Sequence, residues 1–557
     1  MLRKLRKLLR RRKRGATGSQ GAPETRQRSQ DEARHRKDKQ NEDRQSCDKQ
    51  GERLSPQLDV NAARVQAEFG HSEDLRVRHL RIGRDGDTHA LLVSIDGLTD
   101  KQYLTKSVLL PITQTEASWS SGQEAYQYLK ERLLAVADVS EEAHTWVRVL
   151  VALGAGDSAL MIQGVSSALI LGTSGWKERT VEEPVNEPTI RGIKEGFVES
   201  LRTNTALVRR RIGSSRLRIE EHRLGRVSQT AVALVYVAGL ADERVVQEVR
   251  DRLQRINVDA IQASGQLEEF IRDAPYSPFP TWMPTERPDR VSGALLEGRI
   301  VVMTDGSSFQ LVAPATLTMF LGTPEDYFSG FLLASALRAL RFAAFVASLV
   351  LTPVYVAIVT FHQEMLPTSL ILNIASQREG VPFPTVIEAL VIEVLFELMR
   401  EAGVRLPRIV GPAISIIGAL VLGDAAIRAG LVSPIMVVVV AATGIASFSV
   451  PVFSFGTAPR LLRFGFLVLA GALGLFGVIA GLFALQVHLI SLRSLGVPYA
   501  EPLGPVMVTD LKDALIRVPW WRMDRRPRLV GQKSGTRRQG RDLRPEPPTS
   551  RRQEDPR

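Results

Sequence analysis

The apolar and polar positions of this chain separate into three zones. Residues 1–53 are nearly all polar or charged, residues 54–333 mix short apolar runs with polar turns, and residues 342–490 are mostly apolar. A single soluble globule would spread its core-forming residues over its whole length. The segregation therefore predicts a polar tail, a soluble folded part and a helical membrane part.

Two kinds of periodicity alternate in the soluble part. Runs of β-branched and other apolar residues predict strands at residues 89–97, 158–164, 166–172, 229–239 and 298–306. Helix-period segments lie between them, with acidic or small polar residues near their starts and basic residues near their ends, at residues 121–138, 196–204 and 242–256. The mixed pattern occurs twice, which predicts two soluble α/β subdomains, at residues 54–215 and 216–333.

The apolar zone predicts a helical membrane domain over residues 334–490. A helix needs about 20 apolar residues to cross a bilayer core of about 30 Å. Four stretches meet or approach that length, at residues 342–361, 409–423, 431–450 and 464–490. We therefore expect about four full transmembrane helices. They should form a bundle, because small residues that permit close helix contacts recur at Gly471, Gly474 and Gly481.

One helical segment in this zone, residues 383–401, carries Glu388, Glu393, Glu397 and Arg400. Glu393 and Glu397 lie within about 40° of each other on a helix, and Arg400 can pair with Glu397. A carboxylate facing lipid at mid-membrane costs a few kcal/mol, so these side chains must face protein, water or the interface. The segment is either an amphipathic or re-entrant helix at the interface, or a helix lining a polar cavity. In the second case its four charged residues are candidates for an ion path or its gate.

Charge bias predicts the orientation of the membrane domain. The C-terminal tail, residues 491–557, is rich in Arg, and basic segments tend to stay on the cytoplasmic side. No apolar stretch follows the basic residues 2–14, so we expect no signal peptide and a cytoplasmic soluble part. Both ends inside require an even number of crossings, which four full spans and a non-crossing charged helix satisfy.

The N-terminal tail, residues 1–53, is predicted to be disordered, because it has too few apolar residues to offset its chain entropy. Its first residues either stay solvated or form a short basic helix on an anionic membrane surface. No aromatic residue is interleaved among its charges, so we expect no nucleic-acid partner.

The sequence offers little catalytic chemistry. The net charge is +12, with much of the excess in the tails, Cys47 is the only cysteine, and the eight histidines are scattered. We find no phosphate-binding loop, no GxSxG motif and no metal-ligand spacing, so we expect no cofactor, no metal and no enzymatic activity. Asp96-Gly97 and Asp305-Gly306 follow predicted strands and are most simply hairpin turns.

A segment dense in both charge signs occupies residues 177–211. Such a surface is normally solvated, and its other use is a protein contact in which Arg–carboxylate pairs fix the orientation. For the second case, the candidate residues for a subunit contact are Arg179, Glu183, Glu187 and Arg191.

Several motifs in consistent order resemble the GerA family, the A subunits of bacterial spore germinant receptors. They include RTVEEPVNEPTIRG (179–192), TERPDR (285–290), EGRIVVMTDGSS (297–308), FHQEMLP (361–367), REGVPFP (378–384) and GALVLGDAAIRAGLVS (418–433). The likeness runs from about Leu92 to Trp521. Gly192-Ile193-Lys194 departs from the family, which usually has Gly-Pro before a basic residue.

The resemblance implies a multi-pass protein in the inner membrane of the spore that is not an enzyme. It implies a B-type transporter-like subunit and a C-type lipoprotein subunit as partners, and a homo-oligomer that forms a nutrient-gated path for ions. It also favours a subunit contact at residues 177–211. The alternatives are a stand-alone membrane transporter, for which we see no internal repeat, and a membrane-anchored signalling enzyme, for which we see no catalytic constellation.

Overall fold

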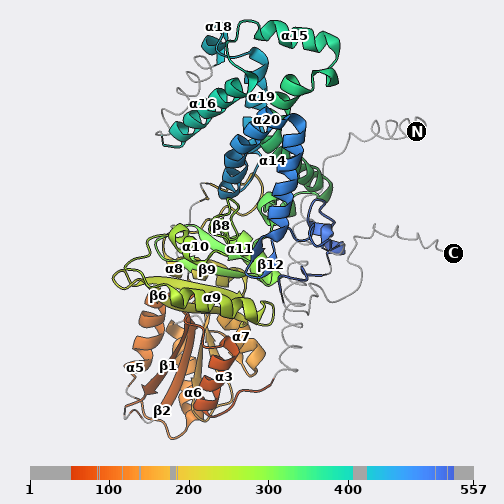
Figure 1. The fold of residues 1–557 in the computed structure, drawn as a ribbon. Helices are drawn as coiled ribbons and strands as arrows, with labels where there is room; N and C mark the ends of the chain where they lie inside the picture. Colours follow the sequence, from red (N-terminus) through yellow and green to blue (C-terminus); the bar gives the residue numbers. More distant parts are fainter. Residues whose placement is uncertain are drawn as a thin grey trace, which may run out of the picture.

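A computed structural model describes residues 52–84, 86, 88–115, 117–136, 139–175, 183–184, 186–405, 423–507, 510–523 and 525–531. The predicted disordered tail, Arg179, most of the predicted crossing at 409–423 and the end of the basic C-terminal tail lie outside these residues. Figure 1 shows two sheet domains and a bundle of helices stacked end to end, with the first sheet domain farthest from the bundle.

The first sheet has the strand order β1-β2-β4-β5-β3, and every neighbouring pair is antiparallel. Its strands are β1 (Leu75–Ile82), β2 (Thr88–Ile95), β3 (Val139–Ala143), β4 (Ser158–Ile162) and β5 (Ala168–Leu171). Helices cover both of its faces, and each face has its own apolar core. One face packs on α3 (Leu58–Phe69) and α7 (Trp146–Ala155). The other packs on α6 (Gly122–Val136) and the run α4 (Lys101–Tyr103), η2 (Leu104–Leu109) and α5 (Leu110–Thr113).

The second sheet repeats this topology, with the order β6-β7-β9-β10-β8 and antiparallel pairing throughout. Its strands are β6 (Leu217–Leu224), β7 (Thr230–Val237), β8 (Met283–Thr285), β9 (Ile300–Thr304) and β10 (Gln310–Ala313). One face packs on α9 (Glu243–Arg255) and α10 (Ser264–Ile271). The other packs on α8 (Leu201–Arg211), α11 (Pro288–Glu297) and α12 (Leu317–Leu321), followed by α13 (Glu325–Phe328).

The predicted strands correspond to β2, β4, β5, β7 and β9, which carry long buried runs. The edge strands β1 and β6 alternate charged and apolar residues and were not predicted. Helix α8 begins later than predicted, because the side-chain amide of Asn204 donates to the Val198 carbonyl and accepts from its N–H. The pattern of strands and helices predicted the α/β subdomains but not the direction of their strands, which the structure shows to be antiparallel.

The two predicted hairpin turns have different outcomes. Asp305-Gly306 connects the antiparallel pair β9 and β10, as expected. Asp96-Gly97 is not a hairpin turn, because β2 leads into helix α4. The Asp96 side chain is almost fully buried and forms ion pairs with Lys101 at 2.8 Å and with Arg202 at 2.6 Å. This carboxylate ties helix α8 to the first sheet, which a local turn motif does not indicate.

The helical part contains α14 (Phe331–Phe361), η4 (Gln363–Met365), α15 (Thr368–Arg378), α16 (Thr385–Arg405), α18 (Ala426–Arg428), α19 (Pro434–Phe448) and α20 (Phe453–Ser491). By length and composition, α14 and α20 are candidate membrane spans. Helix α19 is apolar but shorter. A shared apolar core joins α14, α16, α19 and α20, which supports the expected bundle.

Element α20 reverses direction at Gly474, where φ is 62° and ψ is −144°. A Cβ atom on Gly481 would lie 2.9 Å from Phe466, and one on Gly477 would lie 2.2 Å from the Leu469 carbonyl oxygen. In a straight helix, residues 15 positions apart are separated by about 22 Å. Residues 464–490 are therefore two antiparallel limbs and not the one long crossing that their composition suggested.

The bundle and the second sheet share one apolar core. Phe455 of α20 stacks on Phe320 of α12 and Phe345 of α14, with ring centroids 5.0 and 5.1 Å apart. The chain after α20 returns to the same sheet through β11 (Arg493–Ser494) and β12 (Val497–Pro498), then η6 (Leu511–Asp513) and η7 (Trp520–Arg522). The Ser494 hydroxyl donates to the Thr281 carbonyl at 2.6 Å. A shared apolar core and a hydrogen bond thus join the second sheet domain to the helices.

Candidate functional site

A buried ion pair lies in the middle of the helical bundle. The Glu393 carboxylate of α16 and the Arg463 guanidinium of α20 are 3.0 Å apart, with exposed side-chain fractions of 0% and 1%. The Thr352 hydroxyl of α14 donates to Glu393 at 3.1 Å and lies 2.8 Å from the Thr443 hydroxyl of α19. Four helices therefore contribute polar side chains to one point.

A second layer of charge lies one helical turn away. The Arg460 guanidinium donates to Glu397 at 3.0 Å, and Arg400 lies 3.9 Å from the same carboxylate. The predicted contact between Glu397 and Arg400 is confirmed, but Arg460 is the nearer partner. Arg400 also donates to the Ser447 hydroxyl at 2.7 Å and lies over the ring of Phe448. These contacts hold α16, α19 and α20 together.

Glu388 belongs to a separate contact. Its carboxylate is fully buried and accepts hydrogen bonds from the Ser433 backbone N–H at 2.6 Å and from the Ser433 hydroxyl at 2.5 Å. The Arg378 guanidinium is 3.7 Å away. Glu388 therefore binds the start of α19 to α16, and the structure does not bring it into contact with the Glu393 pair.

Each residue in the cluster of Glu393, Glu397, Arg400, Arg460 and Arg463 contacts a residue of opposite charge. Arg400 and Arg460 share Glu397, so the cluster carries one excess positive charge. Burying an ion pair still costs desolvation energy that the attraction only partly offsets. The Arg463 guanidinium has no well-aligned hydrogen bond among the described residues, although it contacts Glu393. Separating this pair inside the bundle would expose two uncompensated charges, so it requires water or new partners at the same point.

Sequence reasoning missed Arg460, Arg463, Thr352 and Thr443. The predicted crossing began at Phe464 and so left both arginines in a loop. A usable signal was present, since two arginines three residues apart lead directly into an apolar helix and share one face of it. The threonines carry no such signal, because Thr is common in apolar helices and its partner is known only from the packing.

The charged segment 177–211 is held largely by contacts within the chain. Glu187 accepts hydrogen bonds from the Thr285 hydroxyl at 2.5 Å and from Arg290 at 2.9 Å. Arg210 and Arg211 both contact Glu195. These contacts give Glu187 a structural role, whatever its part in a subunit contact.

The other candidates for a subunit contact are more exposed. Glu183 lies 3.4 Å from Lys194 at the surface, and Arg191 is exposed with no ion pair among the described residues. Arg179 lies outside the described residues. A role in subunit contact stays a prediction for all four residues.

The motif TERPDR (285–290) explains why this segment adopts its path. Arg287 is fully buried and donates to the Glu187 carbonyl at 3.0 Å and to the Ile193 carbonyl at 2.8 Å. Asp289 pairs with the same guanidinium at 2.8 Å. Two motifs about 100 residues apart in sequence are therefore one structural unit.

The described residues contain no group of three or more His, Cys, Asp or Glu that could hold a metal ion.

Comparison with known proteins identifies the family. Residues 63–529 match the family described as Bacillus/Clostridium GerA spore germination protein. The chain belongs to the GerA family. The resemblance expected from the motifs is thereby confirmed.

Three relatives of this chain are matched over more than nine-tenths of their own length. Spore germination protein KA of Bacillus subtilis is 45% identical over 498 residues, which are 89% of this chain and 91% of that protein. Spore germination protein GerLA of Bacillus cereus is 36% identical over 85% of this chain and 95% of its own length. An uncharacterized membrane protein of B. subtilis, YfkQ, is 39% identical over 89% of this chain and 96% of its own length.

Among solved structures, the chain is similar to the crystal structure of the N-terminal domain of the A subunit of the Bacillus megaterium spore germinant receptor GerK3. The identity is 32% and the TM-score 0.38, covering 48% of this chain and 98% of that domain. Elements α14 and α20 of this GerA protein are long and apolar enough to cross a membrane. This agrees with the description of its relative YfkQ as a membrane protein.

Proposed function

We propose that this chain is the A subunit of a spore germinant receptor and that it couples nutrient sensing to the opening of an ion-release path in the spore membrane. The observation that carries the proposal is the buried Glu393–Arg463 pair, where four helices meet. An intramembrane ion pair is costly for a structural role alone and is most often part of a polar path.

The proposed gate works by exchange of partners. In the closed packing, Glu393 and Glu397 are neutralised by Arg463 and Arg460. A shift of α16 against α20 would separate these pairs and leave charged, hydratable groups along the bundle. The free energy for the shift comes from contacts that a partner makes differently in the two packings. The shared core around Phe455 connects the soluble part to the same helices.

The proposed topology is multi-pass, with the soluble domains and the C-terminal tail cytoplasmic. At 1.5 Å per residue, the limbs of α20 before and after Gly474 are about 31 Å and about 26 Å long, close to the thickness of a bilayer core. Helix α16 has 21 residues and packs along α14, α19 and α20. We propose crossings by α14, α16, α19 and both limbs of α20, so that α16 crosses the bilayer instead of being the non-crossing helix expected from the sequence. With the crossing predicted from the sequence at residues 409–423, most of which lies outside the described residues, the number of crossings stays even.

We propose that the subunit acts as a homo-oligomer together with a B-type transporter-like subunit and a C-type lipoprotein subunit, and that it is not an enzyme. Exposed Arg191 and Glu183 are the described candidates for contacts between subunits. Single cysteines at 370, 427 and 453, placed in a chain without Cys47, test the topology by labelling from each side of the membrane. Phe453 is 67% exposed at the start of α20, and a cysteine there should be labelled from the cytoplasmic side only. Cysteines at 370 and 427 should be labelled from the opposite side only.

The gate is tested with Glu393→Gln and Arg463→Gln in spores whose only copy of the gene carries the variant. Each variant leaves one buried charge without its partner, so nutrient-triggered ion release should be lost or become independent of nutrient. The matched control is Glu379→Gln, which changes an exposed carboxylate at the end of α15. Normal ion release from folded, membrane-inserted Glu393→Gln protein would refute the gate. Substrate uptake by the purified chain without partners would instead indicate a transporter.

A further inference from the structure

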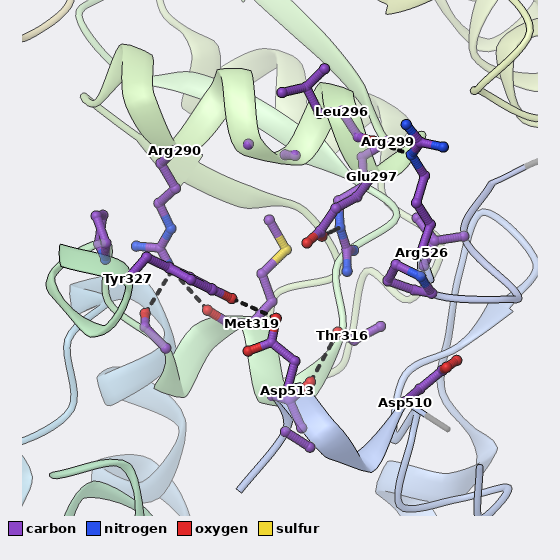
Figure 2. A pocket seen from close by; sticks show the side chains of 18 of the residues that line it. Arg290, Leu296, Glu297, Arg299, Thr316, Met319, Tyr327, Asp510, Asp513 and Arg526 are labelled. Atoms are coloured by element: carbon purple, nitrogen blue, oxygen red, sulfur yellow. Dashed lines mark hydrogen bonds and ion pairs between the residues drawn. The ribbon is translucent and has the colours of Figure 1, made fainter. Parts of the chain in front are cut away.

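A cavity of about 540 Å³ lies outside the bundle, where the second sheet domain meets the returning C-terminal segment. Helix α11 forms one wall and the α12–α13 region the second, and the third comes from residues 501–502, 510–514, 520 and 526–530 of the C-terminal segment. Figure 2 shows Arg290, Leu296 and Glu297 on the α11 side and Asp510 and Asp513 on the opposite side. The volume is in the range of sites for small organic molecules.

The arginines of this cavity are engaged by the protein. Arg290 pairs with Glu187 and donates to the Met319 carbonyl at 2.7 Å. Arg338 binds Asp513 at 2.8 Å. The two remaining guanidiniums also bond to the protein, with Arg299 donating to the Pro314 carbonyl and Arg526 to the Leu296 carbonyl. A ligand would therefore gain little from these cations.

One carboxylate of the cavity lacks a comparable partner. Glu501 is 3% exposed, and neither of its carboxylate oxygens has a hydrogen bond of normal geometry among the described residues. Its pKa is raised to about 7, mainly by burial, with the Asp510 charge adding to the rise, while the Arg299 charge and the Leu529 backbone N–H oppose it. A buried acceptor left without donors is costly, and a cation or donor in the cavity would remove that cost.

The other residues that line the cavity indicate which kind of hydrogen-bond donor or cation could bind to Glu501. Ala294, Met319, Phe328, Pro502 and Val530 give the cavity a largely apolar wall. A bare metal ion needs several oxygen ligands, and no suitable group of three or more acids or histidines occurs among the described residues. An organic cation with an apolar body satisfies both the carboxylate and the wall.

We propose that this cavity binds a small protonated amine, with the ammonium N–H groups donating to Glu501 and the apolar portion lying against the α11 and Val530 walls. This inference goes beyond the proposed gate, because it gives the A subunit a ligand site of its own. The site borders Arg338 of α14, so an occupant would contact the base of a membrane helix.

The test measures direct binding of a probe to the purified full chain in detergent, with ligand-observed NMR as the readout. The probe is 2-phenylethylamine, and 2-phenylethanol is its neutral isostere. We expect saturable binding of the amine, with the alcohol at least about ten-fold weaker, because a charge-assisted hydrogen bond is lost. Glu501→Gln should abolish the preference for the amine. Since binding is measured without spores or partners, its outcome is independent of the gate.

Two further variants separate the site from general effects. Gly293→Leu fills the cavity from α11, where a Cβ atom meets no other atom within 4 Å, and should abolish binding of both probes. Glu268→Gln is the matched control, because burial raises the pKa of that carboxyl to about 7 as well, but it does not line the cavity. Its amine binding should equal that of the wild type.

Three results would overturn the proposal: no saturable amine binding up to the solubility of the probe, equal affinity for amine and alcohol, or unchanged amine binding in folded Glu501→Gln and Gly293→Leu chains.

Discussion

Arg209 holds the two sheet domains together, and replacing it by Leu should destabilise the chain strongly. The side chain comes from α8 and is 1% exposed. Its Nε and Nη2 atoms donate to the two carboxylate oxygens of Asp74, both at 2.9 Å, just before β1 of the first sheet. Nη1 donates to the Leu217 carbonyl at 3.1 Å, where β6 of the second sheet begins, and Nη2 also donates to the Ser72 hydroxyl at 3.2 Å.

The size of the effect follows from what Arg209→Leu leaves behind. Asp74 is 10% exposed in the folded chain, so its charge would remain largely desolvated without a counter-charge. Removing one partner of a buried pair costs ~3–5 kcal/mol, and partial access of water to Asp74 places this case near ~3 kcal/mol. Replacing Asp74 by Leu as well removes the unpaired charge, so the double variant should recover part of that loss.

The assay is denaturant unfolding of the full chain in detergent. Unfolding is measured by tryptophan fluorescence and by protease cleavage between the two sheet domains. The matched control is Arg202→Leu on the same helix, which breaks the contact with Asp96 from a side chain that is 57% exposed. Asp96 is buried but keeps its contacts with Lys101 and Arg76. Because Arg202 itself is exposed, its loss should cost under ~1 kcal/mol. Equal loss of stability in Arg209→Leu and Arg202→Leu, or no recovery in the double variant, would show that this reasoning is wrong.

Two other variants test single features of the fold. Glu501→Gln should stabilise the chain by up to ~3 kcal/mol above pH 7. Burial raises the pKa of Glu501 from 4.5 to about 7 in the folded chain. Above pH 7 the wild-type carboxyl is therefore ionised at a cost in the folded state that the unfolded state does not have, and the neutral Gln avoids this cost. The gain should shrink as the pH falls from about 7 to 4.5, and a gain that does not depend on pH in parallel melts would contradict the assignment. Gly474→Ala should lower the melting temperature in detergent, since a Cβ atom at φ 62° would lie 2.8 Å from the His362 ring. Gly465→Ala in the same element, where a Cβ meets no other atom within 4 Å, should not, and equal melting temperatures for the two variants would exclude backbone strain as the cause.

The candidate site was only half predictable from the sequence. Glu393, Glu397 and Arg400 stand out because charges are rare in an apolar helix, and they cluster as their spacing indicates. Their main partners, Arg463 and Arg460, are more than 60 residues away, and only packing brings them near. Glu388 has the same sequence signal but a different neighbour, Ser433.

The sequence by itself determined the family, the buried central strands and the separation of the sheet-forming part from the apolar helices. Composition, hydrophobic period and the order of motifs can all be read along the chain without knowing the fold. Tertiary structure alone decided the order of the strands, the reversal of α20 at Gly474 and the partners of each buried charge. The physical reason is range. Hydrophobic period and helix preference act over a few residues, whereas an ion pair or a strand register depends on which distant segments the core brings together.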